Sequence, residues 1–112
     1  MRVLIVDDNL DAAESLEEVL IPQGHQVDIA TGGPEALEAY RKHPYDVVFL
    51  DLKMPGMDGQ ETARRLLGLD PGVRIVVVTG NSVHEEHASV AAMGIAGLLR
   101  KPFRVEELLA YL

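Results

Sequence analysis

Short apolar runs alternate with helix-like segments along the whole chain, and this alternation restricts the fold more than any other feature. Four runs are almost continuously apolar, and a fifth alternates apolar and polar residues, which suits an edge strand. The five runs span residues 3–6, 27–29, 46–50, 74–78 and 97–100. Continuous apolar strands indicate a parallel sheet covered on both faces, and their alternation with helices indicates right-handed crossovers.

Residues that cap or break helices mark the boundaries of the helical segments. Asn9 can cap the first helix, and Pro22 ends it. Pro34 suits the first turn of the second helix, and His43-Pro44 closes it. Three further helices are indicated by their apolar positions. The third helix has Ala63, Leu66 and Leu67, and the fourth has Val90 and Ala91 after a cap at Ser82. The fifth has Val105, Leu108, Leu109 and Leu112. The pattern predicts five β/α units in a single domain over residues 1–112.

Composition excludes several classes of function. The chain has 112 residues and no cysteine, which excludes disulfides, thiolate metal sites and thiol nucleophiles. Its net charge of −8 disfavours binding to nucleic acid or to an anionic membrane. The apolar runs are far shorter than the roughly 20 residues that span a bilayer, and no signal peptide is visible. We therefore expect a cytoplasmic location.

Polar side chains follow four of the apolar runs. Asp7 and Asp8 follow the first run, Asp51 follows the third, Thr79 the fourth and Lys101 the fifth. Ligands of open parallel sheets bind at the carboxyl ends of the strands, beside a switch point in strand order. We therefore expect these five residues to form one shared site.

The chemistry expected of this site is phosphoryl transfer. Three converging carboxylates repel one another unless a cation neutralises them, and an all-oxygen ligand set favours Mg²⁺ first and Mn²⁺ second. The carboxylate of Asp51 would be the nucleophile. Lys101 would pair with one phosphoryl oxygen, and the Thr79 hydroxyl would donate to another.

Four motifs, which occur in order along the chain, carry a family resemblance that covers essentially all of its residues. They are Val6-Asp7-Asp8-Asn9, the run from Leu50 to Gly59 (Leu-Asp-Leu-Lys-Met-Pro-Gly-Met-Asp-Gly), Thr79-Gly80 and Lys101-Pro102-Phe103. With these motifs the chain resembles the receiver domain of two-component response regulators, the chemotaxis-receiver-like family. The resemblance implies a flavodoxin-like (βα)5 fold, a doubly wound parallel five-stranded sheet with strand order 2-1-3-4-5.

The resemblance also implies a role for each site residue. Asp51 would be the phosphoacceptor, and Asp7, Asp8, Asp51 and the backbone carbonyl of Lys53 would hold Mg²⁺. Thr79 would be the switch hydroxyl and Lys101 the lysine that contacts the phosphoryl group. The donor would be a phosphohistidine on a sensor histidine kinase or on a histidine phosphotransfer domain. The receiver would catalyse only its own phosphorylation and dephosphorylation.

One position departs from the family pattern. The family usually places Tyr or Phe three residues before the lysine, and here that residue is Leu98. An aromatic readout through this switch position therefore cannot operate in the usual way. In the family, partners or a second copy of the chain bind the surface formed by the fourth helix, fifth strand and fifth helix. We expect signalling through this surface to be weakened or rerouted here.

The ends of the chain suggest a part of a longer signalling protein. The first strand follows Met1 at once, and the last helix stops at Leu112, barely two turns after Val105. We expect an N-terminal receiver with an output domain beyond Leu112, and a receiver excised from a hybrid kinase is the alternative.

Two other functions use the same residues. A metal-dependent hydrolase would use Asp51 as its nucleophile, but such enzymes place a second carboxylate two residues later, where this chain has Lys53. A constitutive interaction module with a vestigial pocket is the other alternative, suggested by Leu98. Turnover of phosphomonoesters would indicate the first, and the absence of a response to Mg²⁺ would indicate the second.

Overall fold

Five parallel strands form one sheet in the computed structural model of the chain, which describes residues 1–52, 59–79, 94–100 and 103–112, with Thr79 described by its backbone. The strands are β1 (Arg2–Val6), β2 (Gln26–Ala30), β3 (Val47–Asp51), β4 (Ile75–Thr79) and β5 (Gly97–Arg100). Their order is β2-β1-β3-β4-β5, and every neighbouring pair is parallel. The predicted strand order is confirmed, and β2 is an edge strand as its alternating pattern indicated.

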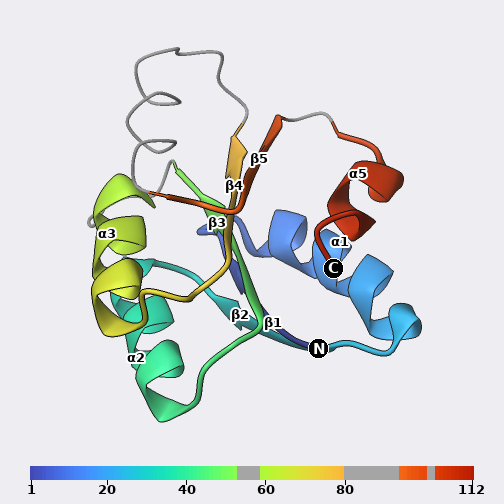
Figure 1. Cartoon of the computed structure of the whole chain (residues 1–112). Coiled ribbons are helices and arrows are strands. Elements are labelled where there is room, and N and C mark those ends of the chain that lie inside the picture. The colour runs from blue at the N-terminus through green and yellow to red at the C-terminus, as the bar shows by residue number, and fades with distance from the viewer. Residues whose placement is uncertain (53–58, 80–93, 101–102) are drawn as a thin grey trace.

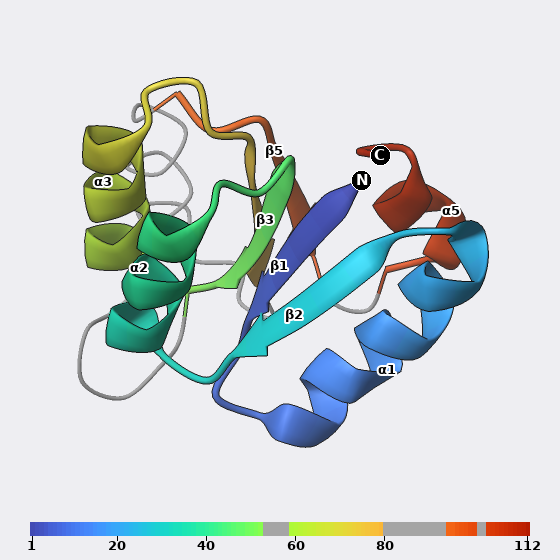
Figure 2. The same cartoon turned by 90° about the horizontal axis from the view of Figure 1, so that it is seen from below.

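Helices cover both faces of the sheet (Figures 1 and 2). They are α1 (Leu10–Leu20), α2 (Gly33–Lys42), α3 (Gly59–Leu69) and α5 (Val105–Leu109), with a short 3-10 turn η1 (Ile21–Gln23) after α1. Helices α2 and α3 lie on one face, and α1 and α5 on the other. The helix predicted around Val90 lies outside the described residues. Among the described helices, none is long and apolar enough to cross a membrane.

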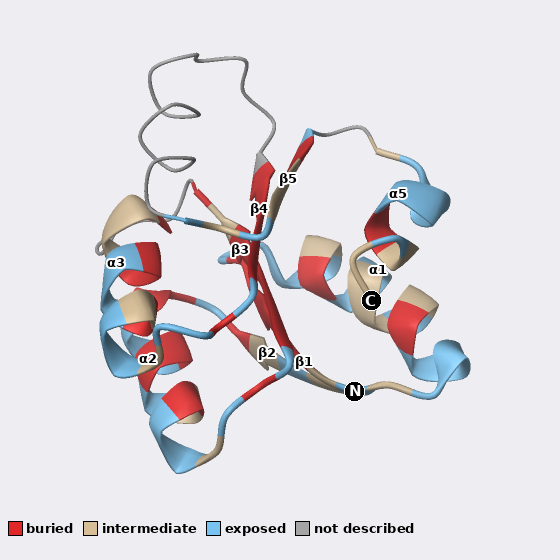
Figure 3. Cartoon of the chain, viewed as in Figure 1, coloured by how far each residue is buried: buried red, intermediate tan, exposed pale blue. Residues whose placement is uncertain are grey.

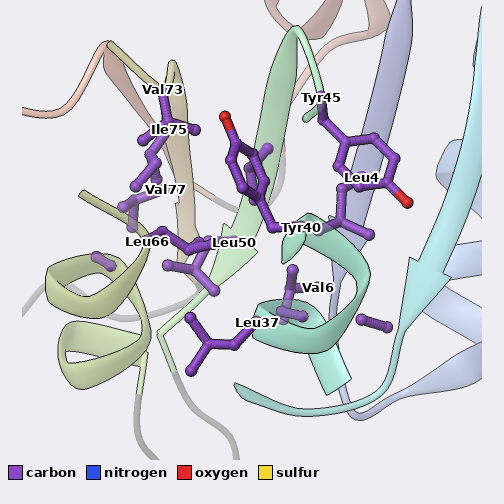
Figure 4. Packing of buried hydrophobic residues seen from close by; sticks show 14 of the residues in the cluster. Leu4, Val6, Leu37, Tyr40, Tyr45, Leu50, Leu66, Val73, Ile75 and Val77 are labelled. Atoms are coloured by element: carbon purple, nitrogen blue, oxygen red, sulfur yellow. The ribbon is translucent and has the colours of Figure 1, made fainter. Parts of the chain in front are cut away.

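The core consists of two layers, one on each face of the sheet (Figure 3). Successive residues of a strand point to opposite faces, so each continuous apolar strand supplies both layers. Leu4, Leu50 and Val77 belong to the layer under α2 and α3 (Figure 4). Ile5 and Phe49 belong to the layer under α1 and α5. This arrangement explains why the strands in the middle of the sheet lack the alternation of a half-exposed strand.

Helix ends follow the predicted capping signals. The Asn9 side chain accepts a hydrogen bond from the Ala12 amide (3.2 Å) and caps α1. The chain leaves η1 through Gly24, whose φ of +91° is left-handed and favours glycine. Pro34 lies in the first turn of α2, and His43 follows its last residue.

Several boundaries differ from expectation. Strands β3 and β4 each begin one residue later than predicted and end one residue later, so Asp51 and Thr79 are the last residues of their strands and do not follow them. Helix α5 has five residues, and Val105 at its start is 47% exposed, although the apolar spacing predicted an inward position. Leu108 is the buried residue of this helix, which ends at Leu109 and not at Leu112 as predicted.

Candidate functional site

Three carboxylates converge at the carboxyl edge of the sheet. Asp51 ends β3, the central strand, and Asp7 and Asp8 follow directly after the neighbouring strand β1. One carboxylate oxygen from each residue lies within 4.8 Å of the other two. Asp7 is buried, Asp51 is half-buried and Asp8 is exposed, so the group opens outward from the sheet. The structure thus brings together the acidic residues that the sequence placed at one site.

Hydrogen bonds fix Asp7 from two sides. Its backbone amide donates to the carbonyl oxygen of Ala30 at the end of β2 (3.0 Å). Its Oδ1 accepts a hydrogen bond from the backbone amide of Asn9 (2.9 Å). Asn9 therefore both caps α1 and holds the buried carboxylate, and only the first of these roles was predictable from the sequence.

A close approach of two backbones fixes the chain on the far side of Asp51. The Gly59 amide donates to the carbonyl oxygen of Leu52 (3.1 Å). A β-carbon on Gly59 would lie 2.7 Å from the Asp51 carbonyl oxygen and 2.9 Å from that of Leu52, which is closer than β-carbons approach other atoms in proteins. The start of α3 can reach the end of β3 because residue 59 has no side chain. In the sequence, Gly59 is recognisable only as the last residue of a Pro/Gly-rich run, and this does not indicate its contact with Asp51 and Leu52.

The other predicted residues are described less completely. Thr79 is the last residue of β4, and its backbone partner on β5 is Arg100. Lys53 and Lys101 lie outside the described residues. Leu98 lies in β5, half-buried, and packs against the core layer under α2 and α3.

The donor set of the carboxylate cluster suits a hard divalent cation. All three side chains offer oxygen, which Mg²⁺ prefers, and a cation would offset the repulsion among charges this close together. Asp7 is 4% exposed, and burial makes an uncompensated charge there costly. The residues present therefore fit a magnesium ion.

Comparison with known proteins identifies relatives over the whole chain. The family model for the response regulator receiver domain matches residues 3–112. A response regulator receiver protein from Anaeromyxobacter sp. (strain Fw109-5) is 39% identical over 108 residues, which are 96% of this chain and 45% of that protein. The chain thus spans about half the length of the curated relatives that it matches.

Solved structures show the same fold. Chemotaxis protein CheY4 from Vibrio cholerae superimposes with a TM-score of 0.91 at 32% identity, covering 97% of this chain and 92% of that one. Response regulator TrrA from Thermotoga maritima, solved in complex with Mg²⁺ and BeF, superimposes with a TM-score of 0.88 at 33% identity, covering 97% and 93%. Receiver domains are the phosphoacceptor switches of two-component systems and generally bind Mg²⁺. The expected fold is confirmed, and the chain belongs to the response regulator receiver domain family.

Proposed function

We propose that Asp51 is the phosphoacceptor of this receiver domain and that it takes its phosphoryl group from a phosphohistidine. The donor would be a sensor histidine kinase or a histidine phosphotransfer domain. The observation that carries the proposal is the convergence of the Asp7, Asp8 and Asp51 carboxylates at the carboxyl edge of the sheet. Among the three, Asp51 extends from the end of a central strand and is half-buried, which gives it both a fixed backbone and access to a donor.

The cation site that we propose is formed by the same edge. Asp7, Asp8, Asp51 and the backbone carbonyl of Lys53 would hold Mg²⁺, with Mn²⁺ as a second choice. When bound, the ion offsets negative charge on the carboxylates and on the phosphoryl oxygens. Asn9 and Ala30 orient Asp7 through the two hydrogen bonds described above.

The proposed transfer step forms one bond and breaks one bond. A carboxylate oxygen of Asp51 attacks phosphorus, the new P–O bond forms, and the P–N bond to the donor imidazole breaks. The imidazole nitrogen leaves with the electron pair of that bond. Lys101 would pair with a phosphoryl oxygen, and the Thr79 hydroxyl would donate to another. Later attack by water on phosphorus restores the carboxylate and releases inorganic phosphate.

The proposed consequence is a switch in a longer signalling protein. Phosphorylation favours one of two states of the domain by as much as the phosphoryl group binds that state better. Because the matched relatives are about twice as long as this chain, we propose an output domain or partner as the recipient of the signal. The surface that includes β5 and α5 is predicted to bind a partner or a second copy of the chain. A cytoplasmic location is likewise a prediction.

Acetyl phosphate with Mg²⁺ tests the assignment directly. The wild type should gain one phosphoryl group by intact mass, and Asp51→Ala should gain none. Asp11→Ala is the matched control, since Asp11 is an exposed carboxylate in the first turn of α1 outside the cluster. Equal labelling of wild type and Asp51→Ala would refute the site. Sustained hydrolysis of phosphomonoesters would indicate the hydrolase alternative, and no response to Mg²⁺ would indicate a vestigial pocket.

A further inference from the structure

The ring of Tyr111 lies directly against the backbone of β5. A β-carbon on Gly97 would fall 2.5 Å from Cζ and 2.6 Å from the hydroxyl oxygen of Tyr111, so the ring fills the space that a side chain at residue 97 would need. Gly97 is the first residue of β5. Tyr111 is half-buried and packs against the core layer shared with α1 and α5. The segment after α5 is thereby in contact with the strand itself and not only with its side chains.

A second contact ties Tyr111 to the neighbouring strand. The carbonyl oxygen of Tyr111 accepts a hydrogen bond from the Arg74 guanidinium (2.9 Å). Arg74 directly precedes β4, and its neighbour strand β5 pairs with β4 from Val76↔Gly97 onward. Tyr111 therefore contacts the first residue of β5 through its ring and the residue before β4 through its carbonyl.

These two strands carry two of the residues proposed to contact the phosphoryl group. Strand β4 ends at Thr79, and β5 ends at Arg100, one residue before Lys101. Because β5 is paired with β4 from Val76↔Gly97 to Thr79↔Arg100, a shift of Thr79 toward a phosphoryl group would be passed on to β5. A displacement of β5 would move Gly97 relative to the Tyr111 ring, and the ring already lies where a side chain at residue 97 would be.

Residue 98, where the family usually has an aromatic ring, does not take part in the contact between Tyr111 and β5. Leu98 points to the opposite face, where it packs under α2 and α3. We propose that Tyr111 reports the position of β5 to α5, so that an aromatic ring on the face of the sheet opposite to residue 98 provides a readout where Leu98 offers none. This inference rests on the proposed function of Asp51.

Fluorine NMR of the chain labelled with 3-fluorotyrosine tests the inference. The chain has three tyrosines, Tyr40, Tyr45 and Tyr111, so the spectrum should contain three protein resonances, and Tyr111→Phe identifies the third. Addition of Mg²⁺ and beryllium fluoride, a phosphoryl mimic, should shift the Tyr111 resonance more than the other two. The bound beryllium fluoride gives a fluorine signal of its own, which reports occupancy independently of any tyrosine.

Gly97→Ala is the decisive variant, because the added methyl meets the far end of a side chain and displaces the ring while leaving the strand in place. We expect this variant to bind beryllium fluoride and to lose the Tyr111 response. Arg74→Gln removes the carbonyl contact without touching β5 and should reduce the response, which provides a second test should Gly97→Ala fold poorly.

The outcomes separate this inference from the proposed function. A bound beryllium fluoride signal with an unmoved Tyr111 resonance overturns the inference and leaves the role of Asp51 intact. An undiminished Tyr111 response in both variants overturns it as well. The absence of a bound beryllium fluoride signal in the wild type overturns the proposed function and the inference together.

Discussion

The amide of Gly59 donates a hydrogen bond to the carbonyl oxygen of Leu52 (3.1 Å), which ties the first residue of α3 to the residue after Asp51. The bond joins the two residues that flank residues 53–58, which include Lys53, the proposed carbonyl ligand. The glycine leaves no room for a side chain at this point, since the obstructing atoms belong to the backbone of Asp51 and Leu52. The position of α3 and the geometry of the candidate site are therefore coupled through one contact.

Gly59→Ala should consequently weaken both the fold and the site. The added methyl must push α3 away from β3, and overpacking of this kind costs about 1–3 kcal/mol of unfolding free energy. We expect a lower urea midpoint and a weaker affinity for Mg²⁺, measured by denaturation and by titration. Gly68→Ala is the matched control in the same helix, because nothing lies within 4 Å of a β-carbon there. That control should be neutral or more stable by up to about 1 kcal/mol, as expected when alanine replaces a helical glycine.

Asp8→Asn should stabilise the chain when Mg²⁺ is removed. Asp8 is the exposed member of the carboxylate cluster, and its charge lies within 4.8 Å of the other two at their nearest oxygens. Coulomb repulsion at this distance is about 1 kcal/mol in a water-like medium, and salt reduces it. We expect the variant to be more stable than the wild type by about 0.5–1 kcal/mol in EDTA at low ionic strength.

Saturating Mg²⁺ should reverse the order, because an ion that binds the folded state stabilises it in proportion to its affinity. Glu18→Gln, an exposed charge on α1 outside the cluster, controls for the change in net charge. A wild type that gains no more stability from Mg²⁺ than Asp8→Asn does would contradict the role of Asp8.

Local pattern predicted a parallel sheet and a polar site at its carboxyl edge. Continuous apolar strands alternating with helices admit few topologies, and the carboxyl ends of parallel strands share one edge. Asp7 and Asp51 therefore had to approach each other once β1 and β3 were neighbours. The family motifs added the strand order, which the alternation of strands and helices does not determine.

Contacts between residues far apart in the chain were not predictable in the same way. The approach of Gly59 to Leu52 and the packing of Tyr111 on Gly97 depend on how elements settle against one another, and glycine has no side-chain pattern that announces a partner. The hydrogen bond between Arg2 Nη2 and His43 Nε2 (2.8 Å) joins residues 41 positions apart, and neither residue type at these positions indicated it. The exposure of Val105 was not predicted, because apolar spacing indicates which residues share a face of a helix but not how far the helix extends.

Asn9→Ala should destabilise the chain through α1. The Asn9 side chain accepts the Ala12 amide at the start of this helix, and loss of such a cap costs about 0.5–2 kcal/mol. Asn9→Ser keeps an acceptor in the same place and should recover most of the loss. The hydrogen bond to Asp7 comes from the backbone amide of residue 9, so both variants retain it. Thermal denaturation measures the effect, and equal melting temperatures for the two variants would argue against capping.

Tyr40→Phe should flatten the dependence of stability on acid pH. The Tyr40 hydroxyl donates to Asp70 Oδ2 (2.6 Å), and this hydrogen bond, followed by one from the Gly72 amide, holds the pKa of Asp70 below its ordinary value of 3.8. Because the pKa is lower in the folded state, the ionised carboxylate stabilises the fold above about pH 4, and this stabilisation is lost as the pH falls through the folded value. The variant removes the largest cause, so its unfolding free energy should fall less steeply below pH 4.

The alkaline side of the same profile provides an independent measurement. Burial, and then the bond to Asp70, raises the pKa of Tyr40 well above its ordinary value of 10.0. A raised pKa stabilises the fold fully below pH 10.0 and progressively less above it, so Tyr40→Phe should also lose part of the decline at high pH. Tyr45→Phe is the matched control, because it removes a neighbouring hydroxyl, bonded to Asp28 (2.6 Å), and leaves the Tyr40–Asp70 bond in place. Urea denaturation across the pH range compares the variants, and an acid slope in Tyr40→Phe as steep as in Tyr45→Phe would show that Tyr40 does not hold Asp70 ionised.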